Sequence, residues 1–237
     1  MNTIVEVSHY LPIGTTILSA IFVWQILQRY KRKSGAYHLL WWGLGVAIYG
    51  LGTLVESLTT LLGWHVVLFK AWYISGALLG GAPLALGTVY LLLSKRAGHI
   101  SLGVLVAAVA ITSVFVMLSP INYDLVENEI LSSKVLEWQS IRIVSPFINS
   151  LAFLFLVGGA IYSAIRFIGN PASRNVAYGN ILIAIGATLP GVGGIGSRMG
   201  HTELLYIGEL IGVILIWLGY RTCQKPAIVA EPAPARQ

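Results

Sequence analysis

Long apolar blocks, separated by short polar segments, run along this chain. Seven apolar blocks each approach the ~20 residues that a helix needs to cross about 30 Å of hydrocarbon. The blocks lack strand-like alternation, and backbone groups in lipid must be hydrogen-bonded internally, so helices are favoured over a barrel. We therefore predict an all-α, polytopic membrane protein, a seven-transmembrane-helix bundle with spans at Leu11–Arg29, His38–Leu62, His65–Leu93, Gly98–Ser119, Ile143–Phe167, Val176–Ser197 and Glu203–Tyr220.

The same pattern divides the chain into two parts. Residues 1–223 form the predicted membrane domain, and residues 224–237, rich in Pro and Ala, are expected to be a disordered cytoplasmic tail. No basic residue precedes the first apolar block, so we expect that block to be retained as a helix and not removed as a signal peptide.

Composition and charge placement add an orientation. Hydrophobic residues make up 56% of the chain and charged residues 10%, against about 25% charged in typical soluble domains. Bases follow the first, third, fifth and seventh spans, whereas acidic residues gather on the other side, so the positive-inside rule predicts an outer N-terminus and a cytoplasmic C-terminus. We expect a bacterial inner-membrane location. The net charge of +6 then reflects topology and contact with lipid headgroups, and no nucleic acid is expected as a partner.

Three strong ionisable residues lie inside the predicted spans: Glu56, Lys70 and Glu209. A charge at the bilayer centre costs roughly 2.5–3.5 kcal/mol on insertion scales, so such residues are usually paired or functional. The helical rise places all three at one depth, in the outer half of the bundle, together with Tyr73 and Asn149. One hypothesis is a pocket, lined by these five residues, that takes a small ligand from the outer side. The alternative is a Glu56–Lys70 pair that clamps the second and third helices.

Two further patterns concern the backbone. Pro83, in the third span, is expected to kink or loosen that helix. Gly191–Gly196 matches the G-x-G-x-x-G dinucleotide motif but lacks the soluble strand-turn-helix context, so we expect a flexible or re-entrant turn before the last helix.

The side chains needed for cofactor or catalytic chemistry are not gathered in the spans. The histidines lie near predicted helix ends, where they do not supply paired haem ligands, and the last span has no lysine for a retinal Schiff base. Ser, His and Asp do not cluster as a nucleophile system. We expect a non-enzymatic protein without a metal or another cofactor. The one cysteine, Cys223, is expected to be an interfacial thiol, with palmitoylation as the alternative.

Residues 40–93 carry a family resemblance, in Trp41-Trp42, Glu56, Lys70-Ala71-Trp72-Tyr73-Ile74, Gly76, Pro83 and Tyr90. This stretch of about two helices resembles the seven-helix membrane sensor region at the N-terminus of bacterial histidine kinases and nucleotide cyclases. The resemblance implies a receptor whose last helix feeds a cytoplasmic output domain. Here only a short tail follows the last span, so we expect action through a protein partner in the membrane or at its cytoplasmic face.

We therefore predict a receptor-like or ligand-binding membrane module. An alternative from another class is a structural or accessory subunit of a larger membrane complex. A small proton-linked transporter is a third possibility, but no internal repeat or pair of broken helices points to one.

Overall fold

The structure, a computed structural model, describes residues 7–33, 35–126 and 130–226, and within these ranges it is helical. Its longer helices are α2 (Leu11–Arg32), α3 (Tyr37–Leu62), α4 (Val66–Trp72), α5 (Ala82–Leu92), α6 (Lys95–Leu118), α7 (Val144–Ile168), α8 (Arg174–Arg198) and α9 (Thr202–Thr222). A π-helix, η1 (Tyr73–Leu79), joins α4 to α5, and short 3-10 turns are η2 (Tyr123–Leu125), η3 (Ser133–Val135), η4 (Gln139–Ile143) and η5 (Pro171–Ser173).

The seven predicted spans are confirmed in number and position. Seven helical segments of the described chain are long and apolar enough to cross a membrane, with α4, η1 and α5 together making the third. Most ends move by one to three residues from the predicted positions, and α6 begins at Lys95 because Ser94 caps it by accepting a hydrogen bond from the Ala97 amide. Of the predicted tail, residues 227–237 lie outside the described residues.

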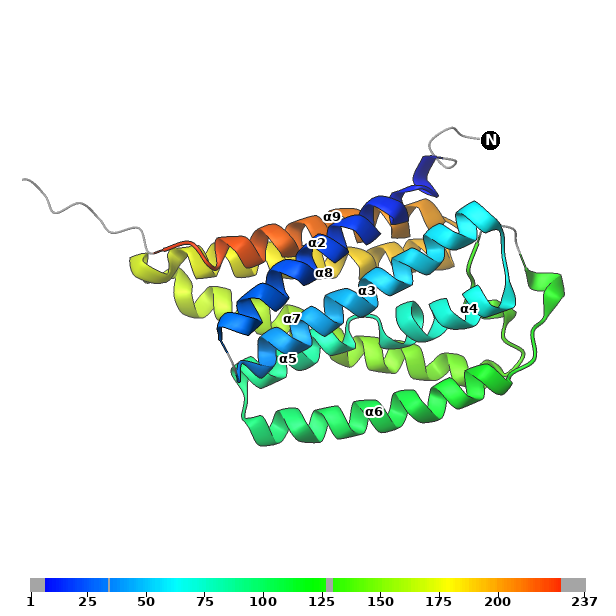
Figure 1. Cartoon of the computed structure of the whole chain (residues 1–237), viewed down its shortest axis with the longest axis horizontal. Coiled ribbons are helices and arrows are strands. Elements are labelled where there is room, and N and C mark those ends of the chain that lie inside the picture. Colours follow the sequence, from blue (N-terminus) through cyan, green and yellow to red (C-terminus); the bar gives the residue numbers. More distant parts are fainter. Residues whose placement is uncertain (1–6, 34, 127–129, 227–237) are drawn as a thin grey trace, which may run out of the picture.

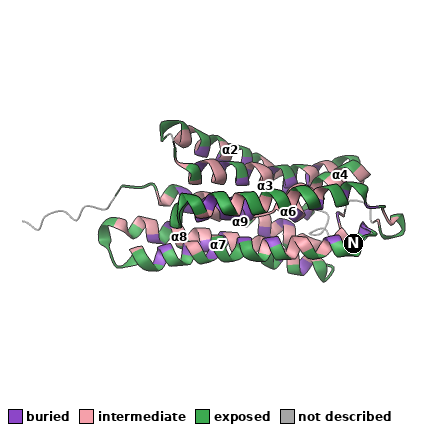
Figure 2. Cartoon of the chain, turned by 90° about the horizontal axis from the view of Figure 1, so that it is seen from below, coloured by how far each residue is buried: buried purple, intermediate pink, exposed green. Residues whose placement is uncertain are grey.

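Six spans form a ring and one lies outside it. Helices α2, α3, α5, α7, α8 and α9 each pack against the next, and α9 returns to α2. Helix α6 runs along the edge of the molecule beside α4 and α5 (Figure 1). Exposed positions cover much of the outer surface (Figure 2), and α6 buries only Gly98, Thr112 and Val116. An outward apolar surface of this kind is what lipid contact requires.

The two ends of the bundle differ in charge. The basic end holds the C-terminal ends of α2, α5, α7 and α9, with Arg29, Arg166 and Arg221 in the last turns of α2, α7 and α9. The opposite end, called the loop end, holds the α3–α4 turn and the α6–α7 connection (Figure 1).

The third span is broken where a kink was predicted, although Pro83 is not itself the break. Gly80 has φ +39°, a left-handed conformation that side chains disfavour, and Gly81 follows before α5 begins. Pro83 then occupies the first turn of α5, where its missing amide costs little. The break follows a π-helical segment, a feature often found at functional sites.

The predicted turn at Gly191–Gly196 is wrong. Helix α8 continues through Pro190 and these glycines to Arg198. Its glycines serve close packing instead, since a Cβ on Gly186 would lie 2.7 Å from the Gly212 carbonyl oxygen of α9, and one on Gly193 would lie 2.6 Å from the Leu204 oxygen. Small residues that let two backbones approach are a common device of membrane helices. Helices α8 and α9 thus form a tightly packed pair.

Candidate functional site

Two acidic side chains from distant parts of the chain meet inside the bundle. Glu56 of α3 is 4% exposed, and Glu209 of α9 has a buried carboxyl oxygen. The two side chains interact directly with each other. Two of the three predicted intramembrane charges therefore come together, and we call this contact the carboxyl pair.

One oxygen of the pair has a defined donor. Trp72 Nε1, at the end of α4, donates a 2.9 Å hydrogen bond to Glu56 Oε1. The indole can reach this oxygen because α3 and η1 approach closely at glycines: a Cβ on Gly52 would lie 3.1 Å from the Gly76 Cα, and one on Gly76 would lie 3.4 Å from Trp72 Nε1. The glycines of the second and third spans thus place an indole N–H against a buried acid.

A polar face of α3 continues away from Glu56. Tyr49, Thr53 and Glu56 recur at a spacing of four and three residues, which puts them on one face of the helix. Tyr49 OH donates to the Glu209 backbone carbonyl oxygen at 3.1 Å, and Thr53 Oγ1 lies 2.9 Å from Thr16 Oγ1 of α2. This face therefore links α3 to both α2 and α9.

The remaining oxygens give the pair its chemistry. Oε2 of Glu56 and Oε2 of Glu209 are buried, and neither receives a hydrogen bond from an N–H or hydroxyl of the described residues. Two buried carboxylates this close repel each other strongly, whereas one proton converts the contact into an O–H···O hydrogen bond. Two buried carboxyl groups in contact can hold a proton, or another small cation, between them.

Lys70, the third predicted charge, lies apart from the pair. Its Nζ donates to the carbonyl oxygens of Met117, at 2.7 Å, and Ser119, at 3.2 Å. These carbonyls belong to the C-terminal end of α6, which lacks intrahelical partners and carries the negative end of the helix dipole. The expected Glu56–Lys70 ion pair is therefore not formed, because the ammonium finds stronger acceptors at that helix end.

Asn149 and Tyr73 occupy two further places. Asn149 Nδ2 donates to the Ala77 carbonyl oxygen at 2.8 Å, next to the break in the third span, and Ser145 Oγ donates to the same oxygen. Tyr73 is 1% exposed and packs on Phe69 and Trp72. The structure therefore corrects the expectation of one pocket lined by five residues, because only Glu56 and Glu209 come together.

Sequence reasoning did not assign roles to two residues of this site, Tyr49 and Thr53. Their spacing from Glu56 was a usable signal, since polar residues three and seven positions before a buried acid share its face. The contact between Trp72 and Glu56 depends on the close approach of α3 and η1, which the local sequence pattern does not predict.

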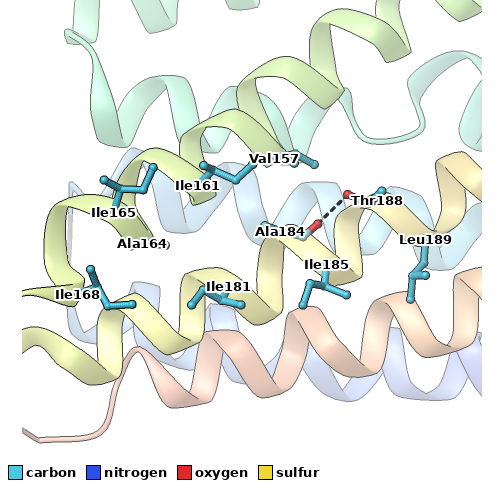
Figure 3. A pocket seen from close by; sticks show the side chains of 10 residues that line it. All are labelled: Val157, Ile161, Ala164, Ile165, Ile168, Ile181, Ala184, Ile185, Thr188 and Leu189. Atoms are coloured by element: carbon cyan, nitrogen blue, oxygen red, sulfur yellow. Dashed lines mark hydrogen bonds between the residues drawn. The ribbon is translucent and has the colours of Figure 1, made fainter.

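A groove lies elsewhere, between α7 and α8 (Figure 3). It has a volume of about 550 Å³, and apolar side chains line it, including Val157, Ile165, Ile181 and Ile185. The hydroxyl of Thr188, also in the lining, is occupied by a 2.8 Å hydrogen bond to the Ala184 carbonyl oxygen. The groove therefore suits a hydrocarbon group and not a polar ligand.

Comparisons with known proteins add no relative. No family model, no curated protein and no solved structure matches this chain.

Proposed function

We propose that this protein is a non-enzymatic, receptor-like membrane module whose ligand is a proton, or another small cation, held by the carboxyl pair. The observation that carries the proposal is the contact between Glu56 and Glu209, in which each Oε2 is buried and receives no hydrogen bond from the described residues. A buried acid without a donor is costly, and a bound proton removes that cost.

The position of the pair along the helices and the placement of basic residues predict which side of the membrane the pair is nearer. Glu56 lies six residues before the end of α3, and Glu209 seven residues after the start of α9, so the pair is nearer the loop end. Bases concentrate at the opposite end, which the positive-inside rule assigns to the cytoplasm. We therefore place the N-terminus outside, the C-terminus inside and the pair in the outer half of a bacterial inner membrane.

A proton on the pair has a defined mechanical consequence. Protonated, the pair attracts α9 to α3; doubly charged, it pushes the two helices apart. Helix α9 is tightly packed on α8 through glycines, so these two helices respond as one unit. The same helix ends at the basic end, where a partner chain could sense its position. Any ligand effect must come from such a difference in affinity between two states.

A proton held by the pair would make the stability of the fold depend on pH. An exposed carboxyl group in the unfolded chain is deprotonated above about pH 5, whereas under this proposal the folded pair holds one proton. The folded state then binds more protons than the unfolded state, so stability falls as the pH rises through the range where the pair releases its proton.

Trp72 provides a built-in reporter for the test. We would titrate tryptophan fluorescence in mild detergent and subtract the signal of Trp72→Phe. The proposal predicts a pH transition in this difference that disappears in Glu209→Gln. Trp24→Phe is the control, because Trp24 is 63% exposed on α2. A Trp72 signal that is flat with pH would overturn the proposal.

An accessory role is the second candidate, and α6 favours it. This helix lies outside the ring, and its outward residues include Ile100, Val104, Ile111 and Phe115. A partner helix in a larger complex could pack there. Mass spectrometry of chains that co-purify in mild detergent separates the two candidates: a stable complex that the variant Val104→Trp breaks, while the Trp72 signal stays flat, favours the accessory role.

A further inference from the structure

The α7–α8 groove reaches the basic end of the bundle. Its lining on α7 runs from Val157 to Ile168, the last residue of that helix. Eleven residues of helix rise about 16 Å, roughly half of a hydrocarbon core about 30 Å thick. The groove therefore has the depth of about one leaflet, measured from the basic end.

An arginine lies where the groove opens. Arg174, the first residue of α8, precedes Ile181 by seven residues, which is two helical turns, so both lie on the same face of α8. The Arg174 side chain is exposed and makes no hydrogen bond or ion pair with any residue the structure describes. Arg166 of α7 is not part of this site, because it lies about 200° around the helix from Ile168 and donates to the Tyr162 hydroxyl at 3.2 Å. An exposed cation is thus aligned with the apolar groove.

We propose that this groove binds one acyl chain of an anionic lipid and that Arg174 holds its headgroup. The chain would lie along Ile181 and Ile185, whose surroundings offer no free polar group because the Thr188 hydroxyl is already bonded to its own helix. The headgroup would meet the Arg174 guanidinium group and the positive N-terminal end of α8. The apolar lining of the groove, its depth and the positive charge at its mouth thus match a lipid with a negatively charged headgroup.

The apolar part is tested by filling the groove. Wild-type protein in detergent would be mixed with phosphatidylglycerol or with phosphatidylcholine of the same acyl chains, and retained lipids counted by native mass spectrometry. We expect phosphatidylglycerol to be retained in preference, and Ile185→Trp to abolish that retention. The matched control is Ile195→Trp, because Ile195 is also exposed on α8 but lies outside the groove.

The headgroup part is tested by charge removal. A base near the membrane surface contributes about 1 kcal/mol to binding of anionic lipid, so Arg174→Gln should weaken phosphatidylglycerol binding about fivefold. Arg174→Lys should restore most of the affinity. Arg96→Gln, at the basic end but on α6, should leave it unchanged.

Three results would overturn the proposal. The first is equal retention of the two lipids. The second is phosphatidylglycerol binding that neither Arg174→Gln nor Ile185→Trp alters. The third is a dimer that Ile185→Trp disrupts while lipid retention is unchanged, which would assign the groove to a second copy of the chain. If Ile185→Trp does not fold, judged by elution and thermal unfolding, the arginine variants decide alone.

Discussion

Trp72 Nε1 and Glu56 Oε1 are joined by a 2.9 Å hydrogen bond that ties the third span to the second. The bond satisfies one oxygen of a buried acid, whereas its other oxygen, Oε2, is buried without a hydrogen-bond partner among the described residues. Its donor comes from the residue that immediately precedes the π-helix, so the backbone irregularity and the carboxyl pair are parts of one arrangement.

Removing this donor should destabilise the fold. In Trp72→Phe the ring remains while the N–H is lost, which leaves Glu56 with an unsatisfied oxygen and costs about 1–3 kcal/mol. Thermal or denaturant unfolding in detergent measures the change. Trp24→Phe, on the exposed face of α2, should be close to neutral. Equal stability of the two variants would remove the claim that this bond supports the site.

Lys70 should act on α6 and not on Glu56. Lys70→Met removes two hydrogen bonds from a charged donor to carbonyl oxygens, so we expect a loss of about 1.5–3 kcal/mol, while Lys70→Arg should recover part of it. Because Lys70 and Glu56 share no contact, the effects of Lys70→Met and Glu56→Gln should add to within about 0.5 kcal/mol in a double-mutant cycle. A larger coupling energy would reinstate the ion pair.

The break in the third span should require glycine at position 80. Gly80→Ala forces a side chain into a left-handed conformation, and its Cβ would lie 2.4 Å from Asn149 Oδ1. We expect a loss of at least about 1–3 kcal/mol. Gly103→Ala is the control, since nothing lies within 4 Å of that Cβ and alanine favours the helix interior. If both variants were equally stable, the break would not require glycine at position 80.

Cys223 should react slowly with thiol reagents. Burial raises the pKa of its thiol to about 11, and the Val176 carbonyl oxygen and Asn180 amide lie beside its sulfur. The thiolate fraction below pH 9 is therefore about 100-fold smaller than for an exposed cysteine, and modification should speed up roughly tenfold per pH unit. Maleimide labelling of folded protein, with the same chain in denaturant as the reference, measures this. Rapid labelling of the folded protein near neutral pH would contradict it.

The fold was largely predictable and the site only in part, for physical reasons. Long apolar blocks fix the spans, because lipid allows so few backbone arrangements. Depth estimates brought Glu56 and Glu209 to one level, and the structure joins them. Depth does not determine which way a side chain points around its helix axis. Lys70 and Asn149 lie at the same level, but Lys70 bonds the C-terminal end of α6 and Asn149 bonds a carbonyl oxygen beside the break in the third span. The failure at Gly191–Gly196 has a related cause, since glycines that loosen a soluble helix permit close packing in a membrane.

The most direct test of the account is the protonation state of the carboxyl pair. Infrared difference spectroscopy distinguishes the carbonyl stretch of a protonated carboxylic acid from carboxylate bands. We predict a buried protonated band in the wild type near neutral pH that disappears at high pH and is absent or altered in both Glu56→Gln and Glu209→Gln. Glu203→Gln, whose side chain pairs with His201 at the loop end, should leave the band unchanged. A wild type with no protonated band, or with one that neither glutamine variant affects, would contradict the account.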